Sequence, residues 1–202
     1  TEQEIFSLEE LVEKFSLERV QKSGARFDEQ RLLWLNGQWI RSLELDDLSA
    51  RVENFWGENA QKATPEFRKQ VLSLVFDRLK TLRDLPRASE YFFAEQPADL
   101  EMISGNKQLK KLETAELVEI LRAATIKFEN APSETWTDDG IQEMLNELLA
   151  ETGQKPGILF QLVRICLTWA PFSPALNQTL RVIGQAESVN RLKNSLAKIE
   201  TL

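Results

Sequence analysis

An all-α fold is what this 202-residue sequence predicts, and three observations lead to it. Apolar residues recur at the three- and four-residue spacing of a helix face through most of the chain. Helix-start signals precede several of these runs. Almost no segment alternates apolar and polar residues as a half-buried strand does. The length suits one large helical domain or two smaller ones.

Two helix starts have especially clear signals. Ser7 and Glu10 have the spacing of a capping box before an apolar run. Thr64 precedes Pro65, which fits the first helical position because its missing amide has no partner there, and the run from 67 to 82 then predicts a helix. A proline at 86 predicts a break or a new turn. Further helices are predicted at 45–56, near 107–111, and at 114–128, 138–152, 157–168, 173–184 and 188–199.

The stretch 26–41 predicts a short helix with a signal at each end. Asp28 can accept a hydrogen bond from a first-turn amide, and Asn36-Gly37 offers residues that tolerate positive φ where a helix stops. Trp34 and Trp39 add two large rings. A helix this short needs neighbouring elements to cover such rings, so the sequence predicts a capped core helix.

Composition narrows the class of protein. No apolar run approaches the roughly 20 residues of a membrane span, and the acidic N-terminus lacks a signal-peptide core, so we expect a cytoplasmic protein with no membrane partner. Thr1 is not Met, which suggests a fragment or a processed product. The single cysteine, Cys166, lies in an apolar run and is expected to be a buried thiol. The chain has no histidine, which removes the commonest general base and metal ligand.

Motifs of catalysis are missing from the sequence. It has no glycine-rich phosphate loop, no Gly-x-Ser-x-Gly, no His-Glu-x-x-His and no Cys-x-x-Cys. Carboxylate pairs such as Asp46/Asp47 and Asp138/Asp139 are expected to be caps or solvated helix faces. The sequence therefore favours a binding module over an independent enzyme, with no metal site.

Charge is unevenly distributed along the chain, although the net charge is −7. Residues 112–153 hold ten acidic residues against two basic ones. Residues 68–87 hold six basic against two acidic, a charge of +4, and residues 155–198 hold six against one, a charge of +5. Two basic zones around an acidic one favour a partner that touches specific places, such as a shaped RNA. Solvated faces with no binding role are the alternative.

One stretch has a distinctive order of residues, Phe27-Asp28-Glu29-Gln30-Arg31-Leu32-Leu33-Trp34-Leu35-Asn36-Gly37. With residues 6–25 before it, it resembles the segment just after the catalytic core of bacterial glutamyl-tRNA synthetases, where the pattern is of the type Phe-Asp-x-x-Lys-Leu-x-Trp-Asn-Gly. Thinner similarity continues through 82–93, 155–168 and 184–192. Two departures are Gln30-Arg31, where the family often has Lys, and Trp169, where it usually has Gly. The second is expected to alter that turn.

The resemblance implies two successive helix bundles, an anticodon-binding α-helical cage, after the end of a stem-contact fold. The implied limits are 1–44, 45–98 and 99–202. The implied partners are tRNA(Glu) and the catalytic domain of the same polypeptide, in a monomer. The parent enzyme is an ATP-dependent ligase that uses ATP and Mg, but the ATP-binding signatures of that class are absent here. We therefore expect no cofactor in this chain and no aminoacylation by these residues alone.

The resemblance also implies which side chains face the RNA. Arg78 matches an arginine that contacts the third anticodon base and resembles enzymes that discriminate glutamate from glutamine tRNAs. Its planar guanidinium presents several donors and can stack on an unpaired base. Matches near the first and second anticodon bases are Arg164, Thr168 and Leu176. The basic residues expected to contact the tRNA backbone are Arg68, Lys80, Arg83, Arg181 and Arg191.

Arg164 stands inside an apolar run, and this position needs an explanation. A salt bridge would make it structural, whereas a base or phosphate would make it a binding residue; we favour binding. For the whole chain, the competing hypothesis is an all-helical protein-interaction module without RNA binding.

Overall fold

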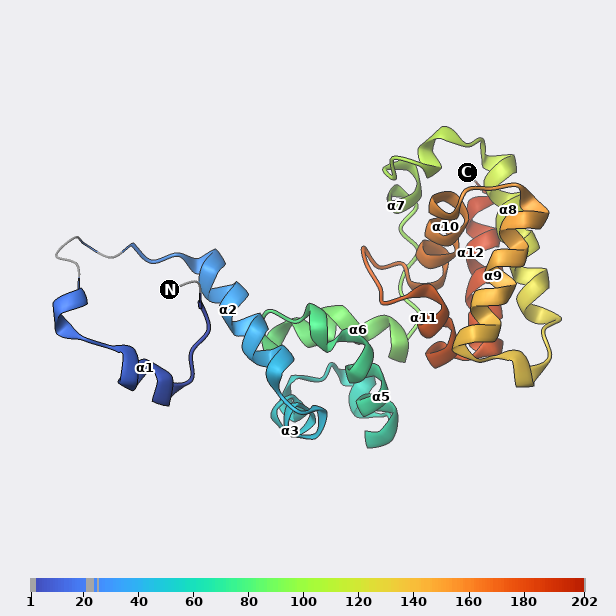
Figure 1. The fold of residues 1–202 in the computed structure, drawn as a ribbon. Helices are drawn as coiled ribbons and strands as arrows, with labels where there is room; N and C mark the ends of the chain where they lie inside the picture. Colours follow the sequence, from blue (N-terminus) through green and yellow to red (C-terminus); the bar gives the residue numbers. More distant parts are fainter. Residues whose placement is uncertain (1–2, 21–23, 25, 202) are drawn as a thin grey trace.

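The computed structural model describes residues 3–20, 24 and 26–201, and every regular element among them is helical. It contains twelve α-helices and six short 3-10 helices in this part of the chain, which confirms the all-α prediction. The N-terminal segment and the C-terminal helices lie at opposite ends of an elongated molecule (Figure 1). No helix of the described residues is long and apolar enough to cross a bilayer.

The N-terminal segment contains α1 (Leu8–Lys14) and α2 (Glu29–Ser42). The capping box is confirmed: the Ser7 hydroxyl accepts a hydrogen bond from the Glu10 amide at 3.2 Å, and the Glu10 carboxylate accepts one from the Ser7 amide at 2.8 Å. α1 lies apart from the rest of the molecule, and α2 leads from it into the first bundle (Figure 1).

Helix α2 differs from the predicted short helix at its C-terminal end. Asp28 does cap the start, because its Oδ1 accepts from the Arg31 amide at 3.0 Å. The predicted stop at Asn36-Gly37 is wrong, since the helix continues to Ser42. Gly37 is buried there, and a Cβ at this position would come within 3.3 Å of the Leu79 carbonyl oxygen. The glycine therefore permits close helix packing instead of ending the helix.

The tryptophans of α2 also differ from expectation. Trp34 is 40% exposed and Trp39 is 46% exposed, so the described elements leave both rings half open. The side of α2 that packs inward contains Gly37 and Ile40. The prediction of a covered core helix is therefore wrong for the two indoles.

The first bundle consists of α3 (Leu45–Arg51), the short α4 (Glu58–Gln61), α5 (Pro65–Val75) and α6 (Leu85–Phe93). Thr64 caps α5 as predicted, with its Oγ1 accepting from the Phe67 amide at 3.2 Å. The predicted extension of this helix to Leu82 is wrong, because a 3-10 turn at Phe76–Arg78 follows α5. The tighter turn still places Leu79 in the core, where its side chain is fully buried.

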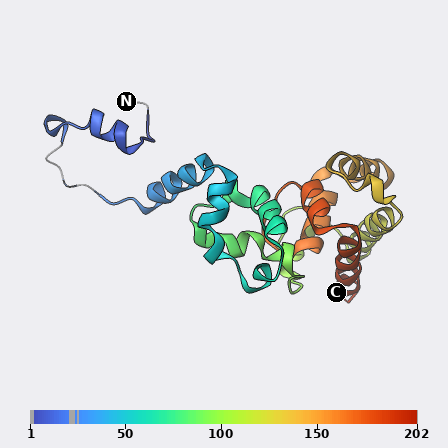
Figure 2. The ribbon, with the colours of Figure 1, turned by 90° about the horizontal axis from the view of Figure 1, so that it is seen from below.

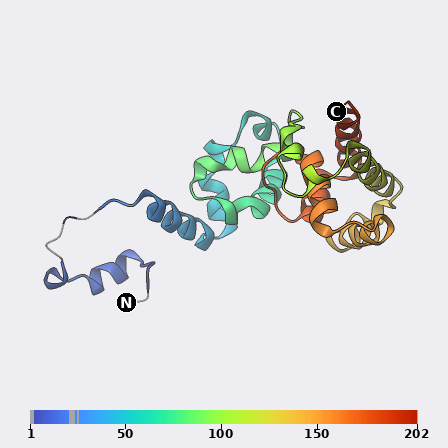
Figure 3. The ribbon, with the colours of Figure 1, turned by 90° about the horizontal axis from the view of Figure 1, so that it is seen from above.

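The second bundle consists of six α-helices, and α8 packs against α9, α10 and α12 at its centre. Views from below (Figure 2) and from above (Figure 3) show the N-terminal segment, the first bundle and the second bundle one after another along the molecule. Helix α11 begins later than the predicted residue 173, because the chain up to Ala175 is extended loop. The helices are α7 (Glu101–Ser104), α8 (Thr114–Glu129), α9 (Asp138–Thr152), α10 (Pro156–Thr168), α11 (Leu176–Ile183) and α12 (Gln185–Ile199).

The buried apolar residues form two clusters. One extends from Ile103 to Ile199, and the other contains Ile40 and the core of the first bundle. Ala170 and Val182 from the second bundle also belong to this first-bundle cluster, so the two bundles pack against each other. The domain limits at 44/45 and 98/99 stay predictions.

Trp169 ends α10 in an unusual backbone conformation. Its φ of 43° and ψ of 40° lie in the left-handed region, where glycine is favoured because other residues are strained there. The indole is buried, and its Nε1 donates to Ser195 Oγ at 3.1 Å. Burial and this hydrogen bond stabilise the tryptophan, so the left-handed turn forms without glycine.

Candidate nucleic-acid interface

Arg78 lies on a turn that helix α2 holds from the outside. Arg41 Nη1 donates to the Asp77 carbonyl oxygen at 3.0 Å, and Asn36 Nδ2 donates to the Lys80 carbonyl oxygen at 2.5 Å. These two hydrogen bonds fix the backbone before and after Arg78. Its side chain is exposed, with only a 3.9 Å approach to Asp77 as an ion pair. The turn therefore presents a guanidinium that is positioned but hardly neutralised.

Arg164 projects from α10 toward the loop that follows this helix. Its Nη1 donates to the Ser173 carbonyl oxygen at 2.9 Å, to Ser173 Oγ at 2.7 Å and to the Pro174 carbonyl oxygen at 2.6 Å. All three acceptors are neutral, and within residues 3–20, 24 and 26–201 no carboxylate forms an ion pair with Arg164. The salt bridge that would have made this residue purely structural is therefore not found in the described part.

Arg78, Arg164 and Tyr91 of α6 are near enough for their charges to influence one another. Burial lowers the pKa of Arg164, and the positive charge of Arg78 lowers it further. Burial raises the pKa of the Tyr91 phenol, while the charges of both arginines act in the opposite direction. Charged side chains from both bundles therefore lie within electrostatic range of the Tyr91 phenol, and we call these three residues the Arg78–Arg164 site. Two like charges within electrostatic range of each other favour an anion nearby.

The basic residues around this site divide into paired and unpaired ones. Arg68 pairs with Glu53 at 2.9 Å and Arg181 with Asp138 at 2.6 Å, so carboxylates already neutralise both. Three exposed cations lie near Arg78 in the sequence and make no ion pair with any described residue; they are Lys80, Arg83 and Arg87. Exposed cations without an ion pair therefore occur on both bundles of the described chain: these three lie near Arg78, and the second bundle carries Lys107, Lys110, Lys111, Lys155 and Lys198.

Three other residues expected to face the RNA are buried. Arg191 is 3% exposed, Leu176 is 5% exposed and Thr168 is 1% exposed. The Thr168 hydroxyl donates to the Arg164 carbonyl oxygen at 2.8 Å within α10. In this conformation none of the three presents a surface to a base or phosphate.

Arg191 instead joins the two bundles. Its Nη1 donates to the Tyr91 carbonyl oxygen at 2.6 Å and approaches the Leu167 carbonyl oxygen at 3.5 Å, while its Nε pairs with Glu187 at 2.7 Å. The two carbonyls lie in the last turns of α6 and α10, where the helix leaves them without an amide partner. The cation also opposes the negative ends of both helix dipoles.

The sequence did not indicate Tyr91 as a site residue, nor the hydrogen bonds from α2 to the turn that carries Arg78. Tyr91 lies in the stretch 82–93, where the family resemblance is thin and which supplied no site residue except Arg83. The spacing of Arg87 and Tyr91 could have indicated it, because residues four apart lie on one face of a helix. The contacts from α2 bridge 44 residues between Asn36 and Lys80, and no local pattern indicates them.

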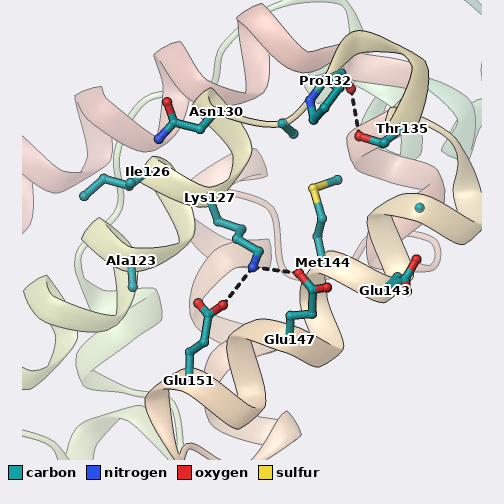
Figure 4. Close-up of a pocket in the computed structure, with 12 residues that line it drawn as sticks. Ala123, Ile126, Lys127, Asn130, Pro132, Thr135, Glu143, Met144, Glu147 and Glu151 are labelled. Atoms are coloured by element: carbon teal, nitrogen blue, oxygen red, sulfur yellow. Dashed lines mark hydrogen bonds and ion pairs between the residues drawn. The ribbon is translucent and has the colours of Figure 1, made fainter.

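A hollow of about 520 Å³ between α8 and α9 is lined by more carboxylates than cations (Figure 4). Lys127 reaches across it and pairs with Glu147 at 2.6 Å and Glu151 at 2.8 Å. These hydrogen bonds raise the pKa of Lys127. Glu143 adds a further carboxylate to the lining. The surplus of carboxylates repels phosphate, so this hollow does not extend the basic site.

No group of three or more Cys, Asp or Glu side chains is placed to hold a metal ion in the described part of the chain. The buried Cys166 thiol has a raised pKa because burial disfavours the thiolate. The chemistry of the described site is therefore that of arginine donors and aromatic rings.

Comparison with known proteins agrees with this arrangement. A family model described as an anticodon binding domain matches residues 47–196, which includes Arg78, Tyr91 and Arg164. In fold, the chain resembles a glutamate–tRNA ligase from Elizabethkingia meningosepticum, with a TM-score of 0.75 at 18% identity over 96% of this chain and 37% of that one.

Curated relatives match nearly the whole chain. A glutamate–tRNA ligase of Roseiflexus sp. is 36% identical over 98% of this chain and 39% of its own length. A glutamate–tRNA ligase of Caldanaerobacter subterraneus is 32% identical over 98% of this chain and 40% of its own length. The chain thus spans about two fifths of these relatives. It belongs to the anticodon-binding domain family, in the form found in the glutamate–tRNA ligases that it resembles.

Proposed function

We propose that this chain is the tRNA-binding, C-terminal part of a glutamate–tRNA ligase, and that the Arg78–Arg164 site receives the anticodon of tRNA(Glu). The observation that carries the proposal is that Arg164 donates to neutral acceptors, with no ion-pairing carboxylate among the described residues, while the exposed Arg78 is hardly neutralised. A half-buried guanidinium is costly unless its donors are satisfied. Ser173 and Pro174 already accept from Arg164 Nη1, and the acceptor edges and phosphates of a single-stranded loop would accept from its other nitrogen donors.

Within this site, Arg78 is proposed to contact the third anticodon base. The hydrogen bonds from α2 hold its turn, so little conformational freedom is lost when the guanidinium binds. Lys80, Arg83 and Arg87 would contact the nearby backbone as diffuse positive charge. Arg68 and Arg181 would have to exchange the carboxylate of their ion pair for a phosphate, so we assign them a smaller share of the binding free energy.

The test is a binding titration with tRNA(Glu) and an anticodon-changed control over a range of salt concentrations. Counterion release requires the affinity to fall as salt rises. Arg78→Gln is expected to lower the preference for the correct third base by about tenfold, because one specific arginine contact is worth ~1–3 kcal/mol. Arg122→Gln is the matched control, since Arg122 pairs with Glu200 on the second bundle.

A protein-interaction module without RNA binding is the competing function, and the carboxylate-lined hollow between α8 and α9 is the feature that favours it. Absent or salt-insensitive binding to tRNA would leave only this alternative. Binding that ignores the anticodon would remove the recognition role and keep the RNA partner.

We further propose that the catalytic domain of the same polypeptide covers the apolar surface of the N-terminal segment. Phe27, Leu32, Trp34 and Trp39 are all at least 40% exposed, and so many exposed large apolar side chains on one short segment suit a contact with another domain. ATP and Mg would bind in that domain. The whole protein would be a cytoplasmic monomer, and light scattering can measure its oligomeric state. Tryptophan emission should shift to shorter wavelength in the longer polypeptide. An unchanged spectrum would contradict the covering.

A further inference from the structure

Phe172 is an exposed aromatic residue at the edge of the Arg78–Arg164 site. Among the described residues after position 40, the exposed large apolar side chains are Ile126 and Phe172, the latter 42% exposed. A single exposed apolar residue needs no explanation by itself. What distinguishes Phe172 is the structure that holds it.

The loop that carries Phe172 is fixed on its C-terminal side. Arg164 makes its three hydrogen bonds to Ser173 and Pro174, the two residues directly after Phe172. Pro171 precedes Phe172, so its backbone also has a proline's restricted φ on the other side. The ring is therefore held outward by a constrained backbone, and a ligand that packs on it would lose little entropy.

Arg87 of α6 completes the surface from the first bundle. Its guanidinium carbon lies 5.8 Å from the centre of the Phe172 ring, which is a cation–π arrangement. Arg87 is exposed and has no ion pair within the described ranges of the chain. A planar cation beside an aromatic ring offers two surfaces on which a nucleobase stacks well.

This pair adjoins both the Arg78–Arg164 site and a hollow. Arg87 and Tyr91 lie one helical turn apart on α6, and Tyr91 is the phenol of that site. Arg87 lines a hollow of about 370 Å³, large enough for a small planar ligand, together with Tyr91, Trp169 and Pro171. The one carboxylate in this lining, Glu90, accepts a hydrogen bond from Asn59 Nδ2 at 2.7 Å. A loop whose phosphates and base edges reach the arginines would thus bring a neighbouring base against Phe172.

We propose that Phe172 and Arg87 form a stacking platform for one unpaired base of the anticodon loop. This inference rests on the proposed function of the Arg78–Arg164 site and adds a contact that carries affinity by stacking instead of by hydrogen bonds. Stacking tolerates different bases, so the platform would strengthen binding and align the loop, while Arg78 would supply the discrimination.

The experiment uses this chain and anticodon stem-loop RNAs of tRNA(Glu) with 2-aminopurine at one loop position at a time. Stacking quenches this base, so we expect one position to lose fluorescence when wild-type protein binds. Phe172→Leu keeps an apolar side chain without the ring and is expected to abolish that quenching and weaken binding by about 5- to 100-fold. Phe172→Trp should retain both.

Phe15→Leu is the matched control, because Phe15 is an exposed phenylalanine on the distant N-terminal segment. If the wild type binds with salt dependence and Phe172→Leu binds equally well with equal quenching, the platform is refuted and the proposed function stands. Equal losses in Phe172→Leu and Phe15→Leu would also refute the platform. If the wild type shows no salt-dependent binding, the proposed function fails and the platform fails with it.

Discussion

Replacing Arg191 by methionine would show whether this residue holds the two bundles together or contacts RNA. The side chain is 3% exposed and donates to the Tyr91 carbonyl of α6 at 2.6 Å. Methionine fills a similar volume with a flexible apolar chain, so the substitution removes the hydrogen bonds and the charge without opening a large cavity.

The expected loss follows from the contacts. The carbonyl of Tyr91 would be left without a partner in a buried place, which costs ~1–3 kcal/mol. Removing the cation from the C-terminal ends of α6 and α10 would cost ~0.3–1 kcal/mol for each helix. The partner Glu187 is 43% exposed and regains water, so its loss adds little. Together these effects predict a destabilisation of about 3 kcal/mol.

Urea unfolding followed by tryptophan fluorescence and by circular dichroism would measure it. For a slope of ~2–3 kcal/mol/M, the midpoint should fall by about 1–1.5 M. The control is Lys193→Met on the same helix, whose pair with Glu129 is half exposed and should matter by less than ~1 kcal/mol. The reasoning is refuted if Arg191→Met is no less stable than Lys193→Met, and a selective loss of RNA affinity would then restore Arg191 as a phosphate contact.

Three further predictions concern single side chains. Trp169→Gly should relieve left-handed strain of ~1–2 kcal/mol but lose indole burial of ~3–5 kcal/mol, so we expect net destabilisation of about 2–3 kcal/mol in thermal or urea unfolding; increased stability would show that strain dominates. Cys166 has a pKa raised by burial, so at pH 8 its thiol should resist a disulfide reagent until the protein unfolds; immediate reaction of the native protein would contradict this. Asn36→Ala should cost ~1 kcal/mol of stability and weaken anticodon-loop binding severalfold, because the Lys80 carbonyl loses its donor and the Arg78 turn loosens. Unchanged RNA affinity in that variant would show that the turn holds without α2.

Local chemistry made much of the fold predictable. Ser7 with Glu10, Asp28 and Thr64 each cap a helix as their side chains suggest, because a capping oxygen needs only amides two or three residues away. Pro86 lies in the first turn of α6, where its missing amide leaves no helix bond unmade. The family resemblance also indicated Arg78 and Arg164, and their role in binding RNA stays a prediction.

The remaining features depend on contacts that sequence distance hides. Asn36-Gly37 has the composition of a helix stop, yet here the glycine lets α2 approach the Leu79 carbonyl and the asparagine binds the chain beside it. Arg191 has the charge of a phosphate contact, but two helix ends bury it. In each case a tertiary partner decides the role, and the partner is dozens of residues away.

Because the Arg78–Arg164 site uses residues of both bundles, the proposed anticodon recognition depends on how the two bundles are joined. Arg78 belongs to one bundle and Arg164 to the other, and the positive charges of both act to lower the pKa of the Tyr91 phenol. A truncation after residue 98 would remove Arg164, and with it Ala170 and Val182 from the first-bundle core. The proposed specificity for an anticodon would then depend on the packing contact between the two bundles. Substitutions there that alter no RNA contact, at Arg191 or Trp169 for example, could retune which anticodon is accepted by changing the spacing of the two arginines.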